Sequence, residues 1–131
     1  MTTLSLEWTG GLGFRNGPGS PAITLESSSA DTPSPPQALA YAVMGCMAMD
    51  VLHVLTKKRQ APKGLSVSFE GDRALEYPRR FTAMRLHFRI QGPIDRATVQ
   101  RAVDLSKDKY CSVWHTIRRD VSLDITFVIE P

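Results

Sequence analysis

Two cysteines are the residues best suited to carry chemistry in this chain. Cys46 lies in the middle of a long apolar stretch, and Cys111 follows Lys107 and Lys109 at the expected start of a helix. Lysines and a helix N-terminus both favour the thiolate, which is the reactive form of cysteine, so we expect Cys111 to be activated. If the two sulfurs meet in the fold, they can cycle between a dithiol and a disulfide.

Cys46 also has a plainer interpretation as a small hydrophobic residue of the core, because buried free cysteines are common and usually inert. Asp50, one helical turn later, weighs against it, because a carboxylate in an apolar helix needs a partner or a function. His53 lies two turns after Cys46 on the same helix face, and His115, one turn after Cys111, can assist that thiol or simply pack. A metal site is not expected, because the cysteines and the three histidines lack zinc-motif spacing.

The composition is that of one globular domain spanning residues 1–131. Hydrophobic residues make up 42% and charged residues 22%, which excludes a disordered or fibrous chain. The net charge is +3, and the basic residues are dispersed among acidic ones, so we expect no nucleic-acid partner. Two cysteines are too few for a disulfide scaffold, and the chain does not start with a secretory signal pattern. We therefore expect a cytoplasmic protein.

A long helix is expected to carry Cys46. Ser34 is a good N-cap, Pro35 suits the first helical position, and Gln37 completes a capping box. Residues 39–55 are almost all apolar or small, and basic residues follow at the end where a helix dipole favours them.

The apolar run of this helix constrains its surroundings. Asp50 and His53 interrupt the run, which we judge too short for a membrane span of about 20 residues, so no membrane partner is expected. A helix that is apolar nearly all round must be buried nearly all round. One small domain has difficulty covering it, so we expect a partner chain to cover part of the helix.

The remaining elements indicate an α+β fold. A glycine-rich turn is expected around residues 14–16, between two early strands. A helix over residues 95–105, capped by Asp95, and a second short helix over residues 106–119 are also expected. Alternating apolar residues predict strands at residues 4–8, 22–25, 65–69, 84–90 and 121–129.

Two segments resemble the cysteine motifs of the OsmC/Ohr family. Within that family, the chain is most similar to the small OsmC-like branch. Residues 34–39 leading into 44–51 resemble the first-cysteine helix, and residues 101–106 followed by 109–113 resemble the second-cysteine segment. Pro78, Phe81 and the alternating strand after them also fit. The resemblance is specific over residues 33–118, with both motifs in the family's order.

The resemblance implies an OsmC-like fold in which antiparallel sheets wrap around long central helices in an intertwined homodimer. It also implies a stress-response peroxidase that reduces organic hydroperoxides at the subunit interface, with no metal or cofactor. Cys46 would become a sulfenic acid, and Cys111 would resolve it as a disulfide. An external thiol or a dihydrolipoyl-type reductant would then reopen that disulfide.

One family feature is missing from this chain. Family enzymes hold the first cysteine as a thiolate with an arginine from the early glycine-rich region, for which Arg15 is the nearest match. They commonly pair that arginine with a glutamate, where this chain has Pro36 and Gln37. No ion pair can form there, although Gln37 can accept a hydrogen bond from Arg15. An alternative function therefore stays open, a non-enzymatic OsmC-like dimer that binds an apolar small ligand at its interface.

Overall fold

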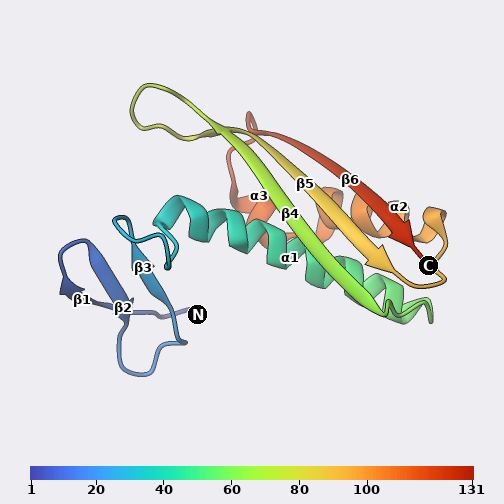
Figure 1. Cartoon of the computed structure of the whole chain (residues 1–131), viewed down its shortest axis with the longest axis horizontal. Helices are drawn as coiled ribbons and strands as arrows, with labels where there is room; N and C mark the ends of the chain where they lie inside the picture. Colours follow the sequence, from blue (N-terminus) through green and yellow to red (C-terminus); the bar gives the residue numbers. More distant parts are fainter. The chain divides into compact units, whose positions relative to one another are not determined.

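The computed structural model describes all 131 residues, which form two compact units, Met1–Tyr41 and Ala42–Pro131 (Figure 1). Each unit contains one three-stranded sheet. The long helix α1 (Pro35–Lys57) begins in the first unit and contributes most of its length to the second.

The first unit is a small antiparallel sheet of β1 (Leu6–Gly10), β2 (Gly13–Asn16) and β3 (Thr24–Glu26), in that order. The sequence prediction of a turn around residues 14–16 was wrong, because these residues form β2. The reversal lies just before them, where Gly10 and Gly11 have φ values of 107° and 55°. Glycine adopts such values without a steric penalty, so β1 can turn directly into β2.

Helix α1 begins as the sequence predicted. The backbone N–H of Ser34 donates to Gln37 Oε1 at 3.0 Å, and the Gln37 N–H donates to Ser34 Oγ at 3.4 Å. This reciprocal pair is a capping box, which satisfies N–H groups that a helix start leaves without partners. Pro35 is the first helical residue, where its missing N–H is harmless.

The apolar run that was predicted to be too short and too interrupted for a membrane span lies within a longer helix. Helix α1 has 23 residues, and its most apolar window has a mean hydropathy of 1.7, so length and composition alone would allow a span. One apolar face of the helix is buried by packing against the rest of the second unit. Its fully buried side chains are spaced four residues apart and contact the core of the second unit: Val43, Met47, Val51 and Leu55.

The second unit is built on a sheet of β4 (Gly64–Arg73), β5 (Phe81–Gln91) and β6 (Ser122–Glu130). Strands β4 and β5 form an antiparallel pair, whereas β5 and β6 run parallel. The predicted arrangement of antiparallel sheets is therefore corrected to a mixed sheet in this unit, and the α+β class is confirmed. A parallel pair needs a long crossover connection, and here that connection contains the second cysteine.

The crossover from β5 to β6 contains three helical segments: α2 (Arg96–Leu105), the π-helical turn η1 (Ser106–Tyr110) and α3 (Ser112–Thr116). Asp95 precedes α2 as predicted, but its side chain does not cap the helix. Its carboxylate accepts a hydrogen bond from Gln60 Nε2 at 3.0 Å, which ties the residues after α1 to the start of α2. The single helix predicted over residues 106–119 is broken at Cys111.

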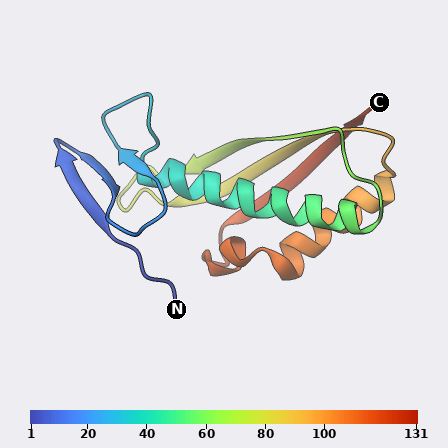
Figure 2. The ribbon, with the colours of Figure 1, turned by 90° about the horizontal axis from the view of Figure 1, so that it is seen from below.

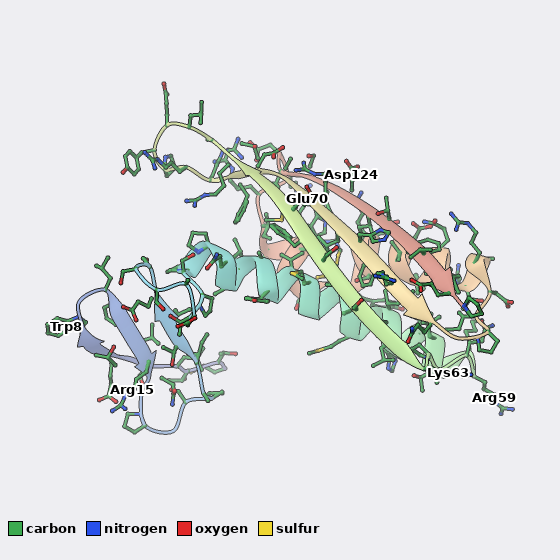
Figure 3. All side chains as sticks on the ribbon, in the orientation of Figure 1. Trp8, Arg15, Arg59, Lys63, Glu70 and Asp124 are labelled. Carbon is green, nitrogen blue, oxygen red and sulfur yellow. The ribbon has the colours of Figure 1, made fainter.

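Helices α1 and α2 cover one face of this sheet (Figure 2). Alternate residues of β5 point into the core with buried residues of both helices, whereas the opposite face carries charged side chains such as Glu70 and Asp124 (Figure 3). The buried side chains of β5 and α2 are Met84, Leu86, Phe88, Ile90, Val99, Ala102 and Val103.

Phe88 is the largest fully buried side chain, so its truncation should be the most damaging single change in this core. We expect Phe88→Ala to lower the free energy of unfolding by about 3–5 kcal/mol, because it removes apolar contacts and leaves a cavity. Denaturant unfolding at a fixed protein concentration measures the loss. Val128→Ala on the exposed face of β6 is the control, and an equal loss in both variants would contradict this assignment of the core.

Candidate active site

Cys46 lies on the second-unit part of α1, where its side chain is half-buried and packs beside the core. Asp50 follows one helical turn later, so both side chains leave the same face of the helix. Helix α1 thus presents a thiol and a carboxylate together to the segment that packs against it.

Cys111 lies where η1 ends and α3 begins, and it is fully buried. Its backbone N–H donates to the carbonyl of Ser106 at 2.8 Å, which closes the wide turn of η1. Its sulfur accepts a hydrogen bond from the backbone N–H of Trp114 at 3.3 Å, so Cys111 is the N-cap of α3. Both contacts hold this cysteine in one place.

The two cysteines meet in the fold. The sulfurs of Cys46 and Cys111 and a carboxylate oxygen of Asp50 all lie within 4.8 Å of one another. The Cys46 sulfur is also 3.9 Å from the hydroxyl of Ser112. A disulfide bond is about 2 Å long, so the two sulfurs are neighbours that must still approach each other before they can bond.

The partner that Asp50 needs is Ser106, whose hydroxyl donates a hydrogen bond to Asp50 Oδ2 at 2.8 Å. Ser106 is only 1% exposed, so this bond joins α1 to the crossover inside the protein. The sequence required a partner for the carboxylate but did not identify it, because Ser106 is distant along the chain. Ser106 and Ser112 are the two site residues that sequence reasoning missed.

The environment of Cys46 favours its thiolate. Burial acts to raise the pKa of this thiol, but hydrogen bonds outweigh it and lower the pKa below the ordinary value. The donors are the backbone of Val113 and the side chains of Cys111 and Ser112, while the charge of Asp50 opposes them. Because only the thiolate is strongly nucleophilic, Cys46 is the more reactive cysteine.

The prediction that Cys111 is the activated thiol was wrong. The pKa of Cys111 is raised to about 11, chiefly by burial and also by the nearby Cys46 and Asp50, although the Trp114 N–H favours the thiolate. Cys111 therefore remains a protonated thiol at neutral pH, able to donate to the Cys46 thiolate. The helix start does contribute a backbone hydrogen bond, but desolvation dominates at a fully buried sulfur.

The histidines take no part in this cluster. A ring nitrogen of His115 pairs with the carbonyl of Lys107 at 2.9 Å, and this contact braces the segment around Cys111. His53 is exposed on α1. Neither side chain is among the groups that shift the pKa of a cysteine.

Arg15 lies on β2 in the first unit, where its side chain is exposed (Figure 3). Its predicted hydrogen bond to Gln37 is absent, because Gln37 Oε1 accepts from Ser34 in the capping box. Pro36 and Gln37 leave the first turn of α1 without an acidic residue, as the sequence indicates. That Arg15 stabilises the Cys46 thiolate stays a prediction.

Comparison with known proteins identifies the family to which this chain belongs. A family model described as OsmC-like protein matches residues 28–126, a stretch that contains both cysteines, Asp50 and Ser106. The chain belongs to the OsmC-like family. The resemblance between its two cysteine segments and those of the OsmC/Ohr family is thereby confirmed.

The relatives of this OsmC-like protein are similar along nearly their whole length. Protein YhfA of Escherichia coli K12 is 36% identical over 127 residues, which cover 95% of each chain. A crystal structure of a hypothetical protein from Aquifex aeolicus is 25% identical and covers 99% of this chain and 96% of its own, with a TM-score of 0.90. The organic hydroperoxide resistance protein OhrB of Bacillus subtilis shares the fold, at 14% identity, 98% coverage of both chains and a TM-score of 0.65.

Two substitutions should shift the reactivity of Cys46 in opposite directions. Ser112→Ala removes a hydrogen bond that lowers the pKa of Cys46, so alkylation by iodoacetamide near neutral pH should slow. Asp50→Asn removes a charge that raises this pKa, so alkylation should become faster. One unit of pKa changes the thiolate fraction by about tenfold when the pH lies below the pKa, which gives the scale of either effect.

The measurement is the rate of mass addition at Cys46 as a function of pH, with Cys111 followed in the same spectra. Cys111 should react far more slowly in every variant because it is buried and protonated. Equal rates at the two cysteines, or shifts of the same sign in the two variants, would contradict the assignment of the activated thiol.

Proposed function

We propose that this OsmC-like protein is a thiol-dependent peroxidase that reduces organic hydroperoxides through Cys46 and Cys111. The observation that carries the proposal is the placement of a half-buried sulfur, Cys46, within 4.8 Å of a fully buried one, Cys111. The chain shares its fold with organic hydroperoxide resistance proteins from Bacillus subtilis and Elizabethkingia anophelis, and this likeness supports the proposal.

The first step uses the Cys46 thiolate. Its sulfur attacks the terminal oxygen of the hydroperoxide, a sulfur–oxygen bond forms and the oxygen–oxygen bond breaks. The sulfur is oxidised to a sulfenic acid, and the leaving alkoxide takes a proton from water and departs as an alcohol. The greater exposure of Cys46 and its lowered pKa suit it to this role.

The second step uses the Cys111 thiol. Its sulfur bonds to the Cys46 sulfur, the sulfur–oxygen bond of the sulfenic acid breaks, and hydroxide leaves as water with the Cys111 proton. Two thiol groups of an external reductant, a simple thiol or a dihydrolipoyl-type dithiol of a reducing cytoplasm, then return two electrons and restore both cysteines. The burial of Cys111 keeps it from reacting with peroxide first.

The outer face of α1 supports the proposal of a homodimer. Met49 is 72% exposed and Leu52 is 45% exposed, although both belong to the most apolar helix of the chain. A side chain added at Gly45 would meet no atom within 4 Å, so the helix is open there too. We therefore propose that a second copy covers this face, and that the intertwined homodimer brings Arg15 to the Cys46 thiolate.

A non-enzymatic role as a carrier of an apolar ligand has less support. A cavity of the second unit lies on the open face of the sheet, among side chains such as Ser68, Arg85 and Thr126. This is the face opposite α1, so the cavity does not supply the apolar pocket at the subunit interface that such a carrier would need. The peroxidase therefore stays the function that the geometry supports best.

Removing each cysteine should block a different step. With excess dithiothreitol, Cys46→Ser should consume no tert-butyl hydroperoxide above the uncatalysed rate, because no sulfenic acid can form. Cys111→Ser should form the sulfenic acid but no internal disulfide, so dimedone should add once per chain, at Cys46. Peroxide assays and intact-protein mass spectrometry measure both results.

Ser68→Ala, on the exposed sheet face, is the matched control and should behave as the unchanged protein does. The proposal fails if the unchanged protein leaves the hydroperoxide unconsumed with excess dithiol, or if Cys46→Ser retains full activity.

A charge on the outer face of α1 should separate the proposed dimer. Leu52→Asp places an unpaired carboxylate where we propose helix–helix contact, and burying such a charge is strongly unfavourable. Sedimentation velocity should show a dimer for the unchanged protein and a monomer for this variant. Val128→Asp, on the exposed sheet face, should remain dimeric, and an unchanged dimer in Leu52→Asp would place the interface elsewhere.

A further inference from the structure

The carboxylate of Asp50 has no part in the peroxide chemistry described above. It lies on the apolar helix α1 beside Cys46, within 4.8 Å of both sulfurs, and forms no salt bridge. Its negative charge disfavours the thiolate that the peroxidase needs. Its hydrogen bond with Ser106 joins α1 to the crossover, and its place beside two sulfurs indicates a second role.

We propose that the reduced dithiol site binds a thiophilic divalent cation, such as Zn²⁺, through Cys46, Asp50 and Cys111. Each residue offers one ligand atom, and the three atoms lie within 4.8 Å of one another. Around a tetrahedral Zn²⁺, with bonds of about 2.0–2.3 Å, neighbouring donors lie about 3.5–3.8 Å apart. The three donors can therefore close around one ion through small side-chain rotations.

The donor set determines which cations fit. Two thiolates select soft or borderline ions such as Zn²⁺ over Mg²⁺ and Ca²⁺, which prefer sites made of oxygen alone. Three protein ligands leave one of four tetrahedral positions for water or another small ligand, as in open zinc sites. The cation also offsets the mutual repulsion of three anionic groups in one partly buried place.

The neighbours of the three ligands are already fixed in position. Ser106, itself buried, donates to Asp50 Oδ2 and orients the carboxylate, as an outer hydrogen-bond partner does at established metal sites. Cys111 is held by the Ser106 carbonyl and by the Trp114 N–H. Cys46 and Asp50 are set one turn apart by α1, so little ordering is needed when the ion binds.

Binding releases to solvent the proton of the Cys111 thiol, and that of Cys46 where this thiol is still protonated, and needs no oxidant or reductant. The ion and a Cys46–Cys111 disulfide exclude each other, because both use the same two sulfurs. The cation site itself does not depend on the proposed peroxidase, since it requires only the reduced thiols and the carboxylate.

The test is a titration of reduced, metal-free protein with Cd²⁺, followed by the ultraviolet absorption of cadmium–thiolate bonds. Zn²⁺ affinity is then measured by competition with a chromophoric chelator. We expect one ion per chain, and about half of the thiolate absorption after either Cys46→Ser or Cys111→Ser. Asp50→Asn should keep both thiolates but weaken Zn²⁺ binding by at least about tenfold.

Asp104→Asn is the matched control, because Asp104 is an exposed carboxylate on α2 that bonds only to Gln100 in the same helix. It should bind Zn²⁺ as tightly as the unchanged protein does. Thermal unfolding of the metal-free variants shows that each is folded, and Ser106→Ala gives a second, milder weakening through Asp50 alone.

The inference is overturned if Zn²⁺ binding is unaffected by Cys111→Ser or by Asp50→Asn, or if the unchanged protein binds no ion more tightly than these variants. Each of these results is independent of peroxide. A protein that consumes hydroperoxide but binds no cation would therefore refute only this inference, and the reverse result would refute only the peroxidase.

Discussion

The candidate active site depends on the contact between helix α1 and the crossover that joins β5 to β6. Buried apolar side chains of α1, β5 and α2 hold these elements together, and the hydrogen bond from Ser106 to Asp50 sets their alignment at the site. Because Cys46 is one turn from Asp50 and Cys111 closes a turn onto Ser106, this one alignment brings both sulfurs together. The parallel pairing of β5 and β6 makes it possible, since it requires the chain to cross the face that α1 covers.

The same contact gives the two thiols different environments. The crossover covers Cys111 completely, whereas Cys46 remains partly accessible on α1. Desolvation therefore dominates at Cys111 and raises its pKa, whereas hydrogen bonds dominate at Cys46 and lower its pKa. A pair of thiols in unequal surroundings has a built-in order of reaction, because the accessible thiolate meets an oxidant first.

The unoccupied face of α1 connects the site to assembly. One side of the helix packs into the second unit, and the other exposes Met49 and Leu52 beside the open position at Gly45. Such a helix has more apolar surface than one small unit can bury. Cys46 lies on this helix, so an interface proposed here would also form part of the surroundings of the reactive thiol.

The sequence alone determined the features that local rules govern. Ser34, Pro35 and Gln37 start α1 because a capping box needs only neighbouring residues. Alternation of apolar residues located the strands of the second unit, and the two cysteine segments indicated the family that comparison confirmed. The short strand β2 was missed because glycines on both sides of residues 14–16 are typical of turns. The chain does reverse on both sides, at Gly10 and Gly11 and again around Gly19, but residues 14–16 themselves are extended between the two reversals.

Tertiary structure decided the chemistry of the site. From the sequence, lysines and a helix start favoured a Cys111 thiolate, but the burial of that sulfur reverses the expectation, and burial is a property of the whole fold. The expectation of no metal site rested on the spacing of cysteines and histidines, whereas the cation site that we propose uses two cysteines and Asp50, which the fold brings together from two distant segments. Local sequence determines which residues each element carries, but distances between elements depend on long-range packing, and both thiol reactivity and metal ligation depend on those distances.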